Sequence, residues 1–212
     1  MADAERPGAE GWVPESRELS VLEASVDGCR GCELWQNATQ AVFSRGAPDS
    51  TMMLVGEQPG DQEDLAGEPF VGPAGRVLED ALIAAGIDPE RVYLTNAVKH
   101  FRFDQRGKRR IHAKPAVGHI LACHPWLQAE FDAVHPSIVV CLGATAARSV
   151  MGRTVVIGKV RGVLLDAPEG VPAPVLITTH PSSVLRMREK PEREAAFDAF
   201  VIDLRTASNA TK

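Results

Sequence analysis

The chain lacks a long hydrophobic run, an internal repeat and a low-complexity linker. A membrane-spanning helix needs about 20 consecutive apolar residues, and no stretch of this 212-residue chain approaches that length. Residues 1–14 are polar and acidic and have no apolar core of the kind found in a secretory signal. A content of 44% apolar and 24% charged residues excludes a disordered or collagen-like chain. We therefore expect a cytoplasmic protein that does not contact a membrane.

Cysteine is scarce: the chain has four, at Cys29, Cys32, Cys123 and Cys141. A reducing cytoplasm argues against disulfides and for metal ligation. Four thiolates are the ligand set of a 4Fe–4S cluster, and the count leaves none over, so we predict that all four bind one cluster. Zinc is an alternative, although zinc ribbons pair two close couples of ligands. A redox motif formed by the first two thiols alone, or a pair of inert buried thiols at the last two, are further alternatives.

Positive charge is also limited, because the net charge is −5, but it is concentrated in one place. A strip of basic residues comprises Arg102, Arg106, Lys108, Arg109, Arg110, His112 and Lys114. Local potential, and not the net charge, attracts a phosphate backbone. The strip is therefore a candidate nucleic-acid contact, and a solvated basic loop is the structural alternative.

Short apolar segments alternate with helical patterns along the chain. Strands are predicted at residues 51–56, 91–96, 137–142 and 175–179. Helices are predicted at 75–85, 115–134, 144–151 and 191–205. Strands separated by helices give a parallel sheet that is covered on both faces. We therefore predict a three-layer α/β/α fold with a central, roughly four-stranded parallel sheet. One domain is expected over residues 16–206, with flexible ends at 1–15 and 207–212.

Polar residues and glycines follow each predicted strand. Ligands of parallel sheets bind at the carboxyl ends of the strands. The segments at these ends are 56–60, 95–96, 143–144 and 180–183. The sequence therefore predicts a binding site formed by these four segments.

The same segments carry a family resemblance that extends over residues 29–185. The matching stretches are Gly56-Glu-Gln-Pro-Gly-Asp-Gln-Glu-Asp64, Gly67-Glu-Pro-Phe-Val-Gly-Pro-Ala-Gly-Arg76, Thr95-Asn-Ala-Val-Lys99, Leu142-Gly-Ala-Thr-Ala146 and His180-Pro-Ser-Ser183, together with the cysteines. In these residues the chain resembles the uracil-DNA glycosylase superfamily, and specifically its iron–sulfur family 4 branch. The resemblance implies a monomeric DNA-repair enzyme that excises uracil from DNA, accepts single strands and carries a 4Fe–4S cluster.

Two features depart from the usual family 4 pattern. Residues 108–112 lie in an extended loop where that family has a short connection, and Gln58 stands where the family tends to have alanine. Both features resemble the UdgX subgroup, whose members become covalently attached to uracil-containing DNA through the histidine of this loop. The resemblance thus implies covalent capture and a single turnover through His112.

The resemblance also implies roles for residues that would contact the base. Phe70 would stack on uracil, and the amide of Asn96 would distinguish uracil from cytosine. His180 would donate a hydrogen bond to the departing base, and the turn containing Gly56, Gln58 and Asp61 would border it. A core phenylalanine, a turn asparagine and a structural histidine are the alternative interpretations of these residues.

The nucleophile that attacks the sugar cation, either water or a side chain, decides the product of the reaction. A neutral imidazole at His112 is a far better nucleophile than water. We expect Glu57 to orient this imidazole and stabilise its positive charge, with Gln58 helping to anchor the loop and Asp61 able to share either task. Two alternatives remain: an ordinary multiple-turnover glycosylase in which His112 positions water, and a non-catalytic lesion-binding protein.

Two groups of residues are candidate DNA contacts. Lys108, Arg109 and Arg110 would hold the loop and neighbouring phosphates, and Arg110 is the best candidate for anchoring the loop near His112. Ser182, Ser183 and Arg186 belong to a segment that resembles the loop entering DNA beside the flipped nucleotide.

Overall fold

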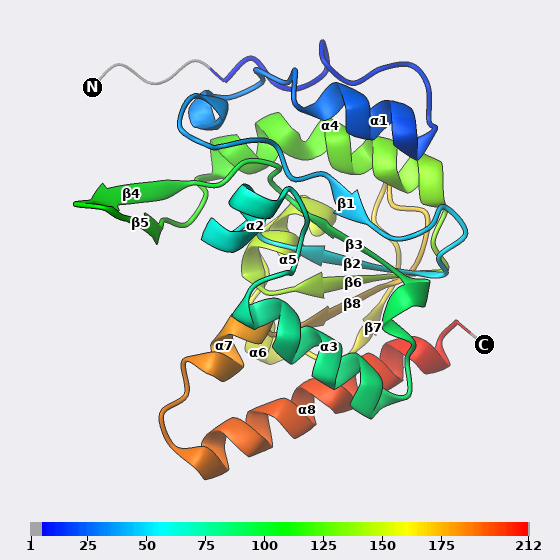
Figure 1. Cartoon of the computed structure of the whole chain (residues 1–212). Coiled ribbons are helices and arrows are strands. Elements are labelled where there is room, and N and C mark those ends of the chain that lie inside the picture. Colours follow the sequence, from blue (N-terminus) through cyan, green and yellow to red (C-terminus); the bar gives the residue numbers. More distant parts are fainter. Residues whose placement is uncertain (1–5, 212) are drawn as a thin grey trace.

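A computed structural model describes residues 6–211 and contains a central sheet between two helical layers (Figure 1). The sheet has six strands in the order β1-β3-β2-β6-β8-β7. Their bounds are Ser44–Arg45 (β1), Met52–Gly56 (β2), Val92–Asn96 (β3), Ile138–Leu142 (β6), Leu164–Leu165 (β7) and Val175–Thr178 (β8). The four central strands are parallel, as predicted. The two edge strands are antiparallel and were not predicted, because two residues are too short for a periodic pattern.

The helices cover both faces of this sheet. Their bounds are Leu19–Val26 (α1), Asp61–Ala66 (α2), Pro73–Ala85 (α3), Val117–Val134 (α4), Ala144–Met151 (α5), Ile157–Val160 (α6), Pro181–Leu185 (α7) and Lys190–Asn209 (α8). Two 3₁₀ turns lie at Glu33–Gln36 and Pro89–Arg91. Helices α3 and α8 lie on one face, and α4 and α5 lie on the other (Figure 1). The three-layer α/β/α prediction is confirmed.

Strand β2 is apolar throughout because it is buried on both faces of the sheet. Met52 and Leu54 pack in the core beneath α3 and α8, whereas Met53 and Val55 pack in the core beneath α4 and α5. Successive side chains of a strand point to opposite faces, so a strand buried on both faces needs apolar residues at every position. This arrangement leaves only the ends of the strands for polar function.

A β-hairpin projects beyond the carboxyl ends of the strands (Figure 1). Its strands are Phe103–Arg106 (β4) and Arg109–His112 (β5), which pair antiparallel in a separate two-stranded sheet. Gly107 at the turn has a φ of 59°, which glycine adopts without steric cost. The structure corrects the predicted extended loop to a hairpin, which we call the β4–β5 hairpin.

Both ends of the described chain pack more extensively than predicted. Ala9 is fully buried, and the Gly8 N–H donates to the Gly31 carbonyl at 3.1 Å. Helix α8 continues to Asn209, with Ala207 fully buried. Packing therefore extends beyond the predicted limits of 16 and 206; residues 1–5 and 212 lie outside the described residues. Within residues 6–211, every helix is too short or too polar to cross a bilayer.

Candidate functional site

A cavity of about 730 Å³ opens at the carboxyl ends of the parallel strands. Each of the four central strands contributes to its lining: Glu57 and Gln58 follow β2, Asn96 ends β3, Leu142 ends β6 and His180 follows β8. The β4–β5 hairpin adds His112, and α7 adds Ser182. The predicted site at the strand ends therefore corresponds to a real cavity.

Gly56 allows two predicted base contacts to approach the sheet. A Cβ at this position would lie 2.2 Å from Oδ1 of Asn96 and 2.7 Å from Cζ of Phe70. Asn96 is 3% exposed, and within residues 6–211 its amide has no hydrogen-bond partner. The amide therefore keeps a donor and an acceptor for a ligand in the cavity.

Phe70 is held in an unusual backbone conformation. Its φ of 60° is rare for a bulky residue and is costly unless the surroundings enforce it. A Cβ at Gly75 would lie 1.6 Å from the Phe70 carbonyl oxygen, so glycine is required where α3 packs against this residue. The Phe70 ring lies nearly parallel to that of His180, with centroids 6.5 Å apart. The strained backbone thus fixes an aromatic surface beside the cavity.

His180 is partly buried and held in one tautomer. Its Nδ1 accepts a hydrogen bond from the Ser182 backbone N–H at 3.1 Å, so the proton of the neutral ring is on Nε2. The pKa of His180 is lowered to about 4, chiefly by burial and to a smaller extent by electrostatic contributions from Arg186 and His112. The cavity therefore contains a neutral imidazole whose Nε2–H is available to donate.

His112 lies across the cavity from the sheet, at the end of β5. Its side chain is 48% exposed, and its Nε2 lies 3.4 Å from Oε1 of Glu57. The other Glu57 oxygen accepts a hydrogen bond from the Thr145 hydroxyl. The expected partnership of His112 and Glu57 thus has its geometric basis, and Thr145 is a further contact that the sequence reasoning did not identify.

Gln58 joins the two strands of the hairpin at its base. Its amide nitrogen donates to the carbonyls of Arg102 at 3.0 Å and Ala113 at 3.2 Å. Its amide oxygen accepts from the Arg102 backbone N–H at 3.2 Å. The expected anchoring role of Gln58 agrees with these contacts, and the side chain also lines the cavity.

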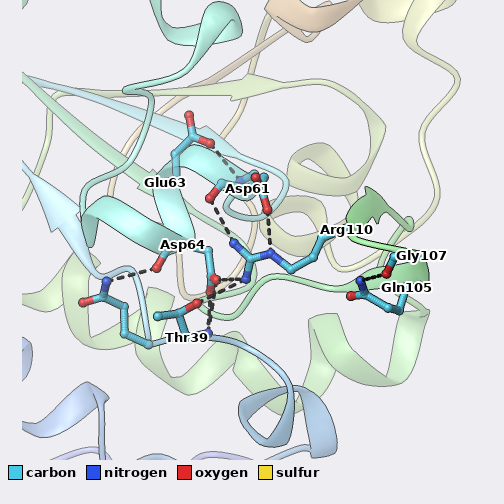
Figure 2. A network of polar contacts seen from close by, with 9 residues as sticks. Thr39, Asp61, Glu63, Asp64, Gln105, Gly107 and Arg110 are labelled. Carbon is cyan, nitrogen blue, oxygen red and sulfur yellow. Dashed lines mark hydrogen bonds and ion pairs between the residues drawn. The ribbon is translucent and has the colours of Figure 1, made fainter.

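Arg110 fastens the middle of the hairpin to α2 (Figure 2). Its guanidinium donates to Asp61 at 2.6 Å and to Asp64 at 2.5 Å. Its Cζ also lies 5.5 Å and 5.3 Å from the ring centroids of Phe101 and Phe103. Asp64 is fully buried and was not identified from the sequence.

These contacts correct the role of Asp61, which was expected to border the base. Asp61 does not line the cavity, because its carboxylate faces Arg110. Arg110 is correspondingly engaged by two carboxylates, so its charge serves the hairpin and is not free for a phosphate.

The candidate DNA contacts fall into two places. Ser182, Ser183 and Arg186 line the cavity, where Arg186 donates to the two hydroxyls at 3.0 Å and 3.3 Å. Lys108 and Arg109 are exposed at the hairpin turn, outside the cavity lining. Lys114, which was not singled out as a site residue, also lines the cavity.

Three of the four cysteines lie together. Cys29, Cys32 and Cys123 share a buried cluster between the N-terminal segment and α4. Burial raises the pKa of Cys123 to about 12; Lys99 lowers it, and the other two thiols raise it. These contributions agree with the position of the three thiols in one core cluster.

Cys141 does not join this group, which corrects the prediction of a four-cysteine site. It is fully buried within β6 and packs in the other core cluster, with residues of α4 and α5. Burial is the one cause that raises its pKa, with no contribution from another thiol. Cys141 therefore lies apart from Cys29, Cys32 and Cys123, which share a core cluster.

The grouping of the ligands also bears on the zinc alternative. Within residues 6–211, no three His, Cys, Asp or Glu side chains are gathered as the ligands of a single ion would be. A 4Fe–4S cluster takes one ligand at each iron and so needs ligands that are spread more widely. The 4Fe–4S cluster and the zinc alternative therefore both stay predictions from the sequence.

Comparison with known proteins agrees with the architecture of this site. Residues 43–205 match the family model "Uracil DNA glycosylase superfamily". The type-4 uracil-DNA glycosylase of Thermotoga maritima is 36% identical over 181 residues, which cover 85% of this chain and 90% of that protein. The type-4 uracil-DNA glycosylase of Archaeoglobus fulgidus is 32% identical over 184 residues, 83% of this chain and 89% of that protein. This chain belongs to the uracil DNA glycosylase superfamily.

Proposed function

We propose that this protein excises uracil from DNA and is then captured covalently on the deoxyribose through His112, as a DNA-repair protein that acts once. One observation carries the proposal: His112 and Glu57 lie together on the same cavity that Asn96, Phe70 and His180 line. Excision is supported by the type-4 uracil-DNA glycosylase relatives. Capture rests on the position of His112.

Recognition uses the groups at the strand ends. A base inside a duplex is out of reach, so the nucleotide must be flipped out or come from a single strand. The Asn96 amide pairs with one donor and one acceptor of uracil, and cytosine presents the opposite pattern. The Phe70 ring supplies a stacking surface. Ser182 and Ser183, with Arg186, hold neighbouring phosphates at the cavity edge.

Excision breaks the bond between the sugar C1′ and N1 of uracil. The electron pair leaves with the base, which becomes an anion, and the sugar becomes an oxocarbenium-like cation. The Nε2–H of the neutral His180 donates to a uracil oxygen and stabilises the developing negative charge. Because His180 is partly buried, this hydrogen bond is strong and needs little reorganisation.

Capture forms a bond between one His112 ring nitrogen and C1′. The ring becomes positively charged, and Glu57 at 3.4 Å stabilises it. The other ring nitrogen then loses its proton, which ends on the released uracil, so charge and atoms balance. Gln58 and Arg110 hold the hairpin so that the ring stays at the cavity.

A 4Fe–4S cluster would be held by Cys29, Cys32 and Cys123 and one further ligand. Its role here would be structural, because it would cross-link segments that are distant in the sequence. These thiols join the N-terminal segment to α4, below the loop that leads into the hairpin. The cytoplasm, as a reducing compartment, keeps thiols available for ligation. No step of excision or capture requires electron transfer.

The proposed function includes action as a monomer. The partner is DNA that contains uracil, and single strands are accepted because they need no unpairing. The hairpin is exposed and can meet such a strand without rearrangement of the sheet.

The test is incubation of the full chain with an excess of a uracil-containing oligonucleotide. We expect release of one equivalent of uracil per protein, and one equivalent of adduct on a denaturing gel. Repeated turnover without an adduct would instead indicate an ordinary glycosylase. Binding without free uracil would indicate a lesion-binding protein. A thymine-containing oligonucleotide is the matched control and should give neither product.

A further inference from the structure

The carboxylate of Glu57 contacts one residue of the hairpin and one residue of α5. Its Oε1 lies 3.4 Å from Nε2 of His112, and its Oε2 accepts a hydrogen bond from the hydroxyl of Thr145. Within residues 6–211, these are the two polar contacts of the carboxylate. The position of this carboxylate therefore depends on His112 and Thr145.

Thr145 is a firmly held donor. It is 2% exposed and lies in the first turn of α5, which begins at Ala144. The N–H of Gly143, directly before the helix, donates to the carbonyl of Thr178 at 2.9 Å, so the start of α5 is joined to the end of β8. A β-branched side chain also has few rotamers to choose from in a helix. The Thr145 hydroxyl thus has a fixed place beside the cavity.

The other partner of the carboxylate is held less firmly. The His112 side chain is 48% exposed and belongs to the two-stranded hairpin. A hydrogen bond to a charged group stabilises a fixed geometry more than a partly exposed ion pair does. A glutamate side chain also loses rotamer freedom when it is fixed, so a firm partner is needed to hold it. Thr145 therefore determines where the Glu57 carboxylate lies.

We propose that Thr145 is a positioning residue that holds Glu57 toward His112 and so sets the ratio of covalent capture to hydrolysis. The inference rests on the proposed function. With Oε2 bound to the hydroxyl, Oε1 faces the imidazole and stabilises the positive charge that the ring gains when it bonds C1′.

Without the hydroxyl, the carboxylate is free to turn toward a water molecule in the cavity. The water oxygen then bonds C1′ while the carboxylate accepts the water proton, which passes on to the uracil anion. This route yields free uracil, an abasic sugar and an unmodified His112, so the chain can act again.

The variants Thr145→Val and Thr145→Ser test this role in the full chain. Valine keeps the branched shape without the hydroxyl, and serine keeps the hydroxyl. With an excess of a uracil-containing oligonucleotide, we measure adduct formed and uracil released. The ratio of adduct to uracil should be the same in Thr145→Ser and the unsubstituted protein. It should be at least about tenfold lower in Thr145→Val, because a displaced group acts far less efficiently.

The matched control is Thr206→Val. This substitution removes a threonine hydroxyl on α8 that bonds the Ile202 carbonyl, outside the cavity lining. It should leave the ratio unchanged. An unchanged ratio in Thr145→Val, or a lowered ratio in Thr145→Ser, would overturn the assignment.

Crystal structures of the two Thr145 variants without DNA supply a readout that needs no reaction. We expect Thr145→Ser to keep the 3.4 Å contact between Glu57 and His112, and Thr145→Val to lose it. A carboxylate that keeps its place in Thr145→Val would overturn the positioning role. If the unsubstituted protein releases uracil without an adduct, covalent capture is refuted and the ratio with it. The crystal structures still decide whether Thr145 holds Glu57, so the two failures are distinguishable.

Discussion

The two sides of the cavity are built differently. On the sheet side, Asn96 is 3% exposed and ends a strand that is hydrogen-bonded on both edges. On the hairpin side, the His112 side chain is 48% exposed and lies on a two-stranded ribbon. Groups on rigid elements hold their geometry, whereas small exposed elements open locally at low cost. In the proposed function, recognition and excision thus belong to the sheet, and capture belongs to the hairpin.

The hairpin is positioned by a few polar contacts. The Gln58 amide bonds both strands at the base, and Arg110 bonds Asp61 and Asp64 on α2. An isolated two-stranded hairpin is marginally stable in water, so these contacts must fix the position of His112. If this division is correct, substitutions on the two sides have different effects on uracil release and on adduct formation.

The largest separation is expected for His112→Ala. Without the imidazole no adduct can form, so capture should fall by at least about 1,000-fold, while water takes the cation and uracil release stays within about tenfold. Denaturing electrophoresis and quantification of free uracil on the same samples measure both effects. A persistent adduct in this variant would refute the assignment of His112.

A substitution on the sheet side should remove both activities together. In Asn96→Ala the base loses the amide that recognises it, so uracil release and adduct formation should each fall by at least about 100-fold. Single-turnover rates with the same oligonucleotide measure this loss. Undiminished capture in Asn96→Ala would mean that the hairpin acts without the sheet, contrary to the comparison.

Loosening the hairpin should slow capture selectively. Arg110→Ala leaves the buried Asp64 without its cation, so we expect a loss of about 1–3 kcal/mol in the free energy of unfolding. Adduct formation should fall about tenfold and uracil release less than threefold. Arg110→Lys keeps the charge but loses the second hydrogen bond. Its rate of adduct formation should lie between those of the unsubstituted protein and Arg110→Ala. Equal losses of both activities would contradict the division.

A pH dependence of stability is also expected from the sheet side. The pKa of His180 is lowered to about 4 by burial, whereas an unfolded imidazole titrates at about 6.5. Between these values the unfolded chain binds more protons, so the free energy of unfolding falls as the pH falls, by roughly 3 kcal/mol for this group. Above about pH 6.5 both states are neutral and the contribution is constant. Urea titrations of His180→Asn should show a flatter profile, and an unchanged slope would contradict the buried neutral state.

The sequence predicted most of the sheet side and less of the hairpin side. The four parallel strands were predictable because burial on both faces demands continuous apolar runs, and Gly56 and Asn96 follow from where those runs end. The hairpin was predicted as a loop, since its strands of four residues carry charged side chains and no apolar alternation. Asp64 and Thr145 were missed because their partners are distant in the sequence.

The cysteine prediction was wrong at one position for a physical reason. A count of four thiols matches a four-ligand cluster, but Cys141 occupies an interior position of β6, where it packs among the apolar side chains of the core.

The central claim is that the His112 ring bonds the sugar carbon that uracil leaves. Its most direct test is protease digestion of the adduct formed with a uracil-containing oligonucleotide, followed by mass analysis that locates the modified residue. We predict a deoxyribose attached to His112 that forms without a reductant and survives denaturation. Attachment at Lys114, the lysine that lines the same cavity, or an adduct that requires borohydride to persist, would contradict it.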